Sequence, residues 1–257
     1  MGNYRQIRYV SGIFFSALVV LFQGKAASAQ PIRVAVSANA ANVARMLALR
    51  FGQHTGIQSE LIIGSSGKLT SQMLHGAPFD VFLSADMKYP EQLYQRHLTT
   101  AAPRIYAHGQ LVLWVNKNIE GSSVLAALQH PQVKRIAVAN PALAPYGTAA
   151  IAALRRLSLL EKIKSKIVYG ESIAQVNQYF LSGVVEAAFT ASPVMSDPGN
   201  QSKGRWYVLN SSWYPPIAQG AVILKSASRR NQRGAAMFYQ FLYSTEAKKI
   251  FKQFGYR

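Results

Sequence analysis

The chain has 257 residues and no cysteine, which excludes disulfide bonds, thiolate metal sites, cysteine nucleophiles and lipid attachment at an N-terminal cysteine. Its 28 Lys and Arg residues against 10 Asp and Glu residues give a formal net charge of +18, which favours anionic partners without naming one. Nucleic acid is the obvious alternative, but the basic residues are spread along the chain and no nucleic-acid motif accompanies them.

Residues 1–29 have the three parts of a secretory signal peptide. Arg5 and Arg8 precede the apolar run SGIFFSALVVLF, and AASAQ offers small residues for cleavage after Ala29. A membrane-spanning helix needs roughly 18 apolar residues, and this run is shorter. We therefore expect an exported periplasmic protein that begins at Gln30 and has no stable membrane insertion after cleavage.

Buried-strand patterns and amphipathic-helix patterns alternate along the rest of the chain. Strands are predicted over residues 32–37, 59–64, 79–85, 109–116, 134–140, 165–170, 185–192 and 217–225. Helices are predicted over about residues 40–53, 67–74, 87–96, 146–157 and 173–181, with two more within 231–253. The alternation predicts an α/β fold of parallel sheets with helices on both faces.

Four predicted strand-to-helix junctions are rich in small and polar residues, at 36–43, 63–69, 140–150 and 169–176. Ligands of α/β folds bind at the carboxyl ends of strands, where the following helices begin. The first amides of a helix have no intrahelical acceptor and lie at the positive end of its dipole, so each junction is a candidate anion site.

The second junction, GSSGKL, raises two interpretations. Gly64 and Gly67 are expected to let a ligand approach the backbone, and Ser65 and Ser66 to add hydroxyl donors. Taken alone, the stretch is more typical of a serine helix cap between flexible glycines. Four junctions of one kind favour a small oxyanion held by neutral donors from several helix starts.

In these motifs the chain resembles the exported substrate-binding proteins of ATP-driven molybdate importers, the ModA family. GSSGKL, GAPFDVFLSAD (76–86) and NPALAPYGTAA (140–150) occur in the family's order, and the resemblance spans essentially residues 31–257. It implies a two-lobed periplasmic binding protein fold of type II, with lobes joined by two crossovers. The implied division is a signal peptide (1–29), lobe 1 (30–109), lobe 2 (110–215) and a return segment of lobe 1 (216–257).

The resemblance also implies the ligand-binding residues, which are Asn39, Ser66, Tyr146 and Ile173. Many members supply a tyrosine hydroxyl as well, but the matching position here is Thr190, as in a subset of the family that lacks this tyrosine. Whether Thr190 or a water replaces that donor stays open, as do the roles of Ala38 and Ser65. Lys68 is expected to point into solvent or to rim the cleft, because neutral donors and helix dipoles suffice for an anion.

The predicted function is capture of molybdate or tungstate and delivery to an inner-membrane ABC permease with its ATPase. Sulfate or another tetrahedral oxyanion is the first alternative, and an exported enzyme on the same fold is the second. Enzymatic activity is not expected, because no nucleophile elbow or acid pair is recognisable and the five histidines lack zinc-ligand spacing. We expect a monomer without nucleic acid, cofactor or directly coordinated metal, since the metal arrives as an oxyanion.

Cleavage of the signal peptide can be checked directly. The intact mass of the exported protein is expected to correspond to residues 30–257. Retention of Met1 in the exported protein would contradict a cleavable signal.

Overall fold

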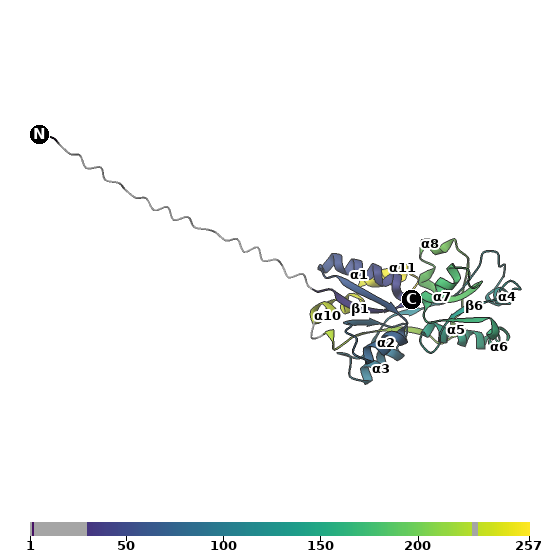
Figure 1. Cartoon of the computed structure of the whole chain (residues 1–257), viewed down its shortest axis with the longest axis horizontal. Coiled ribbons are helices and arrows are strands. Elements are labelled where there is room, and N and C mark those ends of the chain that lie inside the picture. The colour runs from purple at the N-terminus through teal and green to yellow at the C-terminus, as the bar shows by residue number, and fades with distance from the viewer. Residues whose placement is uncertain (1, 3–29, 228–230) are drawn as a thin grey trace.

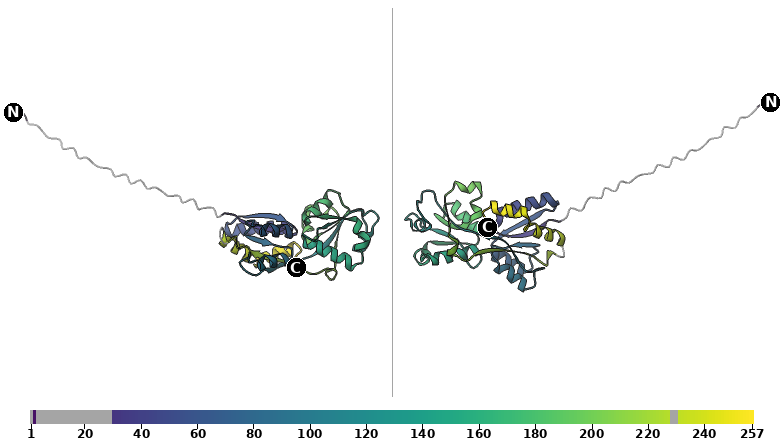
Figure 2. Two further views of the ribbon diagram at one scale, coloured as in Figure 1. Left: turned by 60° about the horizontal axis from the view of Figure 1, so that its bottom comes forward. Right: turned by 180° about the vertical axis from the view of Figure 1, so that it is seen from behind.

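The protein forms two lobes that lie side by side, each built on a five-stranded sheet with helices against it (Figures 1 and 2). The computed structural model describes residue 2, residues 30–227 and residues 231–257, so the predicted signal peptide lies almost wholly outside the described residues. Within those ranges, no helix combines the length and the apolar character that crossing a membrane requires. The two-lobed α/β architecture is as predicted.

The first lobe contains the sheet of order β2-β1-β3-β10-β4. Its strands are β1 (Ile32–Ser37), β2 (Ser59–Gly64), β3 (Val81–Leu83), β4 (Arg104–Gly109) and β10 (Ile217–Ile223). Helices α1 (Ala41–Thr55), α10 (Gln232–Phe241) and α11 (Thr245–Gln253) share one hydrophobic core with this sheet. Helices α2 (Ser66–Leu74) and α3 (Lys88–Gln95) belong to a second core on it.

The second lobe contains the sheet of order β7-β6-β8-β5-β9. Its strands are β5 (Leu111–Val115), β6 (Ile136–Ala139), β7 (Ile167–Gly170), β8 (Ala187–Ala191) and β9 (Arg205–Val208). Its helices are α4 (Val124–Gln129), α5 (Pro145–Arg156), α6 (Leu160–Ile163), α7 (Ile173–Leu181) and α8 (Pro198–Gln201). Trp114 is fully buried and stacks between Phe180 and Trp206, with ring centroids 4.1 and 4.3 Å away, so it serves the core.

Short 3₁₀ helices complete the structure: η1 (Ala38–Ala40), η2 (Lys164–Lys166), η3 (Ser192–Val194) and η4 (Ser211–Trp213). Of these, η1 matters most for function, because it joins the end of β1 directly to the start of α1.

The sheets are mixed, which corrects the prediction of parallel sheets. Strand β10 runs antiparallel to β3 and β4, and β5 runs antiparallel to β8 and β9. Parallel neighbours need a crossover connection that brings the chain back, usually a helix. Here β4 continues into β5 through Gln110 alone, so the chain runs straight on from one lobe to the other.

The chain passes between the two sheets twice. It leaves the first sheet after Gly109 and enters the second at Leu111, then returns between Val208 and Ile217. The predicted lobe boundaries, after residues 109 and 215, fall within these two passages. Strands β4 and β9 and helices α4, α6 and α8 were not predicted; both strands are partly exposed, which weakens the alternation that marks a strand.

Helix α5 begins very close to the end of β6. A Cβ added to Gly147, in the first turn of α5, would lie 1.9 Å from the carbonyl oxygen of Ala139 and 3.0 Å from the backbone nitrogen of Pro141. Both neighbours are backbone atoms, which cannot rotate away. Glycine at this position therefore allows the helix to start against the strand end.

Replacing this glycine tests that close approach. Gly147→Ala is expected to lower the free energy of unfolding by about 1 to 3 kcal/mol through overpacking, measured by urea denaturation. Gly52→Ala in α1 is the matched control, since its Cβ would meet nothing closer than 3.5 Å. The control should gain roughly 0.4 to 1 kcal/mol. Equal stability changes in the two variants would contradict the packing described.

Candidate functional site

The four predicted helix starts meet in one cavity between the lobes. In the first lobe η1 follows β1 and α2 follows β2, and in the second α5 follows β6 and α7 follows β7. Parallel pairing sets Ser37 beside Gly64 and Ala139 beside Gly170, so in each sheet the two strand ends are neighbours. The predicted residues Asn39, Ser66, Tyr146 and Ile173 all line the cavity, together with Ser37, Ala38, Ser65, Ala85, Ala144 and Pro145.

Main-chain N–H groups dominate the chemistry of this cavity. Ser66 and Ile173 are the first residues of α2 and α7, Tyr146 is the second residue of α5, and Asn39 lies in η1. N–H groups at such positions have no intrahelical acceptor. For these four, the structure also provides no other acceptor among the described residues. The arrangement leaves donors from both lobes available to one small ligand.

The cavity is small and carries no charged side chain in its lining. Its volume of about 10 Å³ is far below the roughly 300 Å³ of the smallest pockets that hold drug-sized ligands. Neutral donors together with the positive ends of helix dipoles attract an anion without a lysine or arginine. A compact anion is therefore the ligand class that this geometry favours.

The two serines of the second junction have different roles. Ser65 is the N-cap of α2, where its Oγ accepts a hydrogen bond from the Lys68 amide at 3.4 Å. Ser66 Oγ instead contacts Ser37 Oγ and accepts from the Ala85 amide at 3.0 Å. The helix-cap interpretation therefore applies to Ser65, while Ser66 brings a hydroxyl to the cavity.

The glycines of this junction do not line the cavity, contrary to expectation. Gly67 donates its N–H to the carbonyl oxygen of Leu143 in the second lobe at 2.9 Å. A Cβ at Gly67 would lie 2.8 Å from the Tyr89 hydroxyl oxygen and 3.1 Å from Leu143 Cα, and one at Gly64 would lie 3.2 Å from the Leu69 side chain. Gly67 therefore allows the two lobes, rather than a ligand, to come close.

Two further contacts join the lobes beside Gly67. The Tyr89 hydroxyl donates to the Ala142 carbonyl oxygen at 3.0 Å, and Lys68 Nζ lies 3.0 Å from a carboxylate oxygen of Glu171. Lys68 is about half exposed and does not line the cavity, so it rims the cleft, as predicted. A pair as exposed as this adds little to stability.

A buried network behind the cavity connects both lobes to a returning strand. Gln219 in β10 is fully buried; its Oε1 accepts from Tyr106 OH at 2.7 Å and from Asn39 Nδ2 at 3.1 Å. Its Nε2 donates to Tyr146 OH at 3.2 Å, and Asn39 Nδ2 also donates to Tyr256 OH at 3.3 Å. The Asn39 side-chain amine therefore donates within the network, and its main-chain N–H remains without an acceptor among the described residues.

Burial keeps the phenols of this network protonated. Burial, above all, raises the pKa of Tyr106, Tyr146 and Tyr256 well above the usual value of a tyrosine. Gln219 itself was not predicted as a functional residue. Its sequence signal is a polar residue inside an otherwise apolar strand, IAQGAVI.

Thr190 does not supply the hydroxyl that the resemblance leaves missing. It is fully buried in β8 and donates its hydroxyl to Asn177 Oδ1 at 2.7 Å. It is not among the residues that line the cavity. Ala38 does line it, but its side chain has no polar atom to contribute.

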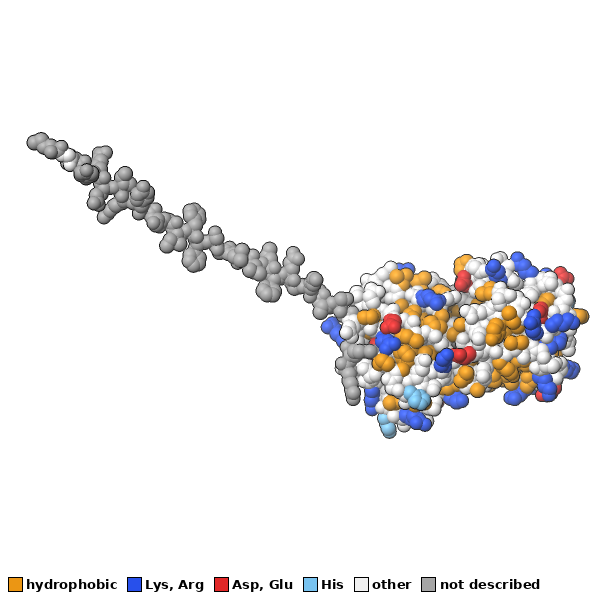
Figure 3. Space-filling view, viewed as in Figure 1, with side chains coloured by type: hydrophobic (Ala, Val, Ile, Leu, Met, Phe, Trp, Pro, Cys, Tyr) orange, Lys and Arg blue, Asp and Glu red, His pale blue; other side chains and the backbone are white. Residues whose placement is uncertain are grey.

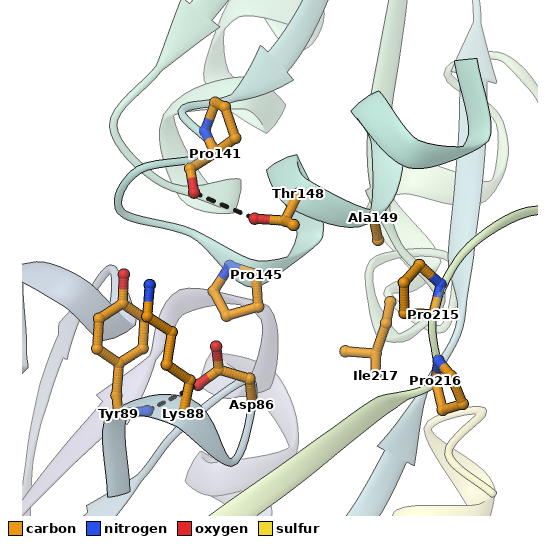
Figure 4. A pocket seen from close by; sticks show the side chains of 10 residues that line it. All are labelled: Asp86, Lys88, Tyr89, Pro141, Pro145, Thr148, Ala149, Pro215, Pro216 and Ile217. Atoms are coloured by element: carbon orange, nitrogen blue, oxygen red, sulfur yellow. Dashed lines mark hydrogen bonds between the residues drawn. The ribbon is translucent and has the colours of Figure 1, made fainter. Parts of the chain in front are cut away.

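A wider cavity of about 190 Å³ opens between the lobes nearby (Figure 4). Its lining includes the carboxylate of Asp86, the amine of Lys88 and several prolines, among them Pro145, which also lines the small cavity. Asp86 accepts from the Tyr89 amide at 3.3 Å, and its burial raises the pKa of its carboxyl group. This lining contains both a carboxylate and an amine and none of the four predicted ligand residues, so this cavity is not the candidate anion site.

Other chemistries find little support in the described part of the chain. It contains no group of three or more His, Asp or Glu residues placed to hold a metal ion. Lys and Arg side chains are scattered over both lobes on the face that Figure 3 shows, rather than gathered in one patch. A scattered distribution is typical of solvated helix faces and not of a nucleic-acid footprint.

Comparisons with known proteins agree with this fold. The family model of bacterial extracellular solute-binding proteins matches residues 32–257. The "Molybdate-binding protein ModA" of Azotobacter vinelandii is 37% identical over 90% of this chain and 91% of its own length, and that of Rhodobacter capsulatus 32% identical over 90% and 89%. The solved structure of the Azotobacter vinelandii periplasmic molybdate-binding protein superposes with a TM-score of 0.82, at 31% identity over 88% of this chain and 98% of that one.

The chain therefore belongs to the bacterial extracellular solute-binding proteins, a family of transport proteins. Within that family it belongs to the ModA group, as its motifs predicted.

The role of Gln219 can be tested by removing its polar atoms. Gln219→Met is expected to lower the free energy of unfolding by roughly 1 to 3 kcal/mol, because Tyr146 OH and its partners lose buried hydrogen bonds. Urea denaturation of the ligand-free protein measures this loss. Gln95→Met, at an exposed position of α3, is the control and should change stability by less than about 0.5 kcal/mol. Similar values for both variants would contradict the network.

Proposed function

We propose that this protein captures molybdate or tungstate in the small cavity and delivers it to an ABC importer. The observation that carries the proposal is the convergence of four unpaired main-chain N–H groups, two from each lobe, on a cavity without charged side chains. Both relatives described above bear names of molybdate-binding proteins, which supports the same ligand class here. The proposed ligand residues are Asn39, Ser66, Tyr146 and Ile173.

The donor set suits a fully deprotonated dianion. Asn39, Tyr146 and Ile173 would donate main-chain N–H groups, and Ser66 would donate its N–H and its hydroxyl. Main-chain donors are held by the fold, so little ordering cost remains on binding. Phosphate near neutral pH carries a proton that needs an acceptor, and a cavity of donors offers it little. Between molybdate, tungstate and sulfate, the size of the cavity decides.

Binding is proposed to be coupled to closure of the lobes. The anion would meet the helix starts of one lobe, and rotation about the two passages between the sheets would bring the donors of the other. The contacts of Gly67 with Leu143 and of Tyr89 with Ala142 would then form across the cleft. Closure presents a surface that a permease can distinguish from the open form.

The proposal also includes the cellular location of the protein and its partners. Export through a signal peptide over residues 1–29 would place a monomeric protein in the periplasm, next to an inner-membrane permease and its ATPase. A binder of sulfate or another tetrahedral oxyanion is the alternative within the same class. An exported enzyme on the same fold is less favoured, because the cavity lining contains no charged or histidine side chain to act as an acid or base.

Calorimetric titration tests the ligand class and the site together. The protein that begins at Gln30 is titrated with molybdate, tungstate, sulfate and phosphate, and tight binding is expected for the first two only. Ser66→Ala should weaken molybdate binding by about 1.5 to 3 kcal/mol, the worth of a hydrogen bond to a charged group.

The matched control is Ser71→Ala, an exposed serine on the same helix, α2. It should bind like the unchanged protein. Tighter binding of sulfate than of molybdate would favour the alternative, a sulfate binder. No binding of any of the four anions would overturn the proposal. Unchanged affinity in Ser66→Ala would remove that hydroxyl from the site.

A further inference from the structure

Two serines from different junctions meet in the small cavity. Ser37 is the last residue of β1, Ser66 is the first residue of α2, and each is only 1% exposed. Their Oγ atoms are hydrogen-bonded to each other, and both residues line the cavity. Ser37 is not among the four residues predicted for the site.

A single main-chain donor holds both hydroxyl oxygens in place. The Ala85 amide, just after β3, lies 3.1 Å from Ser37 Oγ and 3.0 Å from Ser66 Oγ and donates to both. Each oxygen therefore already accepts a hydrogen bond from the backbone. This leaves the hydroxyl hydrogens as the part of each serine that is available to a ligand.

Counting hydrogens shows that the pair has a spare donor. Two hydroxyls carry two hydrogens, and only one of these can lie between Ser37 Oγ and Ser66 Oγ. The other has no acceptor among the described residues. If the bond between the serines opens, both hydrogens can point to one oxyanion while the Ala85 amide still holds both oxygens.

Two other side-chain donors in this region, those of Asn39 and Thr190, are used elsewhere, and the Ser65 oxygen caps α2. Asn39 Nδ2 donates to Gln219 and Tyr256, and the Thr190 hydroxyl donates to Asn177. The Ser37 hydroxyl is therefore placed to provide the side-chain donor that Thr190 does not.

We propose that Ser37 is a further ligand residue, which donates its hydroxyl to the bound oxyanion beside that of Ser66. This inference rests on the proposed oxyanion-binding function and adds a residue to it. The Ser37–Ser66 pair, held by the Ala85 amide, then acts as one two-hydroxyl donor contributed by the first lobe.

The test compares molybdate binding by calorimetry in the mature chain and in Ser37→Ala. Loss of one hydrogen bond to a charged ligand predicts roughly 10- to 100-fold weaker binding. Ser84→Ala is the matched control: Ser84 is a buried serine at the end of β3 whose hydroxyl donates to Asp86 Oδ1, and it does not line the cavity. It should bind molybdate within about twofold of the unchanged protein.

Thermal unfolding separates a ligand role from a structural one. Ser37→Ala should keep most of the ligand-free Tm but show a smaller rise in Tm on adding molybdate. A large fall in the ligand-free Tm with an unchanged rise on adding molybdate would mean that Ser37 serves stability alone, and would overturn the inference.

The double variant Ser37→Ala/Ser66→Ala provides the sharpest readout. In the unchanged protein the bond between the serines must break before both can donate, whereas either single variant has no such bond to break. The loss in the double variant should therefore exceed the product of the two single losses. Binding equal to that of Ser66→Ala alone would overturn the inference while leaving the proposed function intact. No binding of any oxyanion by the unchanged protein would instead overturn the proposed function itself.

Discussion

The unpaired N–H groups at helix starts are the feature on which the rest of the structure depends. A helix must leave its first amides without intrahelical acceptors, and two neighbouring parallel strands that each lead into a helix bring two such helix starts side by side. At the cavity each lobe has such a pair of strands, β1 with β2 and β6 with β7. Because the lobes face each other across a small cavity, amides from four helix starts reach it, and an anion is the ligand that satisfies them.

The polar groups around the cavity are arranged so that these amides stay available. Asn39 and Tyr146 each direct their side chain to Gln219, which leaves their main-chain N–H groups to the ligand. Gln219 lies on β10, the strand through which the chain returns to the first lobe. The same residue therefore links both lobes to the connection between them through buried hydrogen bonds.

Local patterns were sufficient to predict most elements and the four helix starts. The helix predicted over 173–181 coincides with α7, because it follows an apolar strand and opens at a serine cap. Strands β4 and β9 were missed because they are partly exposed, which weakens the pattern that marks a strand. Gln219 and Ser37 were missed because their contacts are distant in sequence. Gln219 contacts Asn39 across 180 residues of chain and Ser37 contacts Ser66 across 29, and no local pattern reports contacts at such separation. The antiparallel strands likewise depend on how the chain crosses between lobes.

The most direct test of the account is a crystal structure of the mature protein grown with molybdate, with diffraction recorded near the molybdenum absorption edge. We predict one strong anomalous peak in the small cavity, with oxyanion oxygens within hydrogen-bond distance of the main-chain nitrogens of Asn39, Ser66, Tyr146 and Ile173. A peak in the wider cavity beside Asp86, or no ordered molybdenum between the lobes, would contradict it.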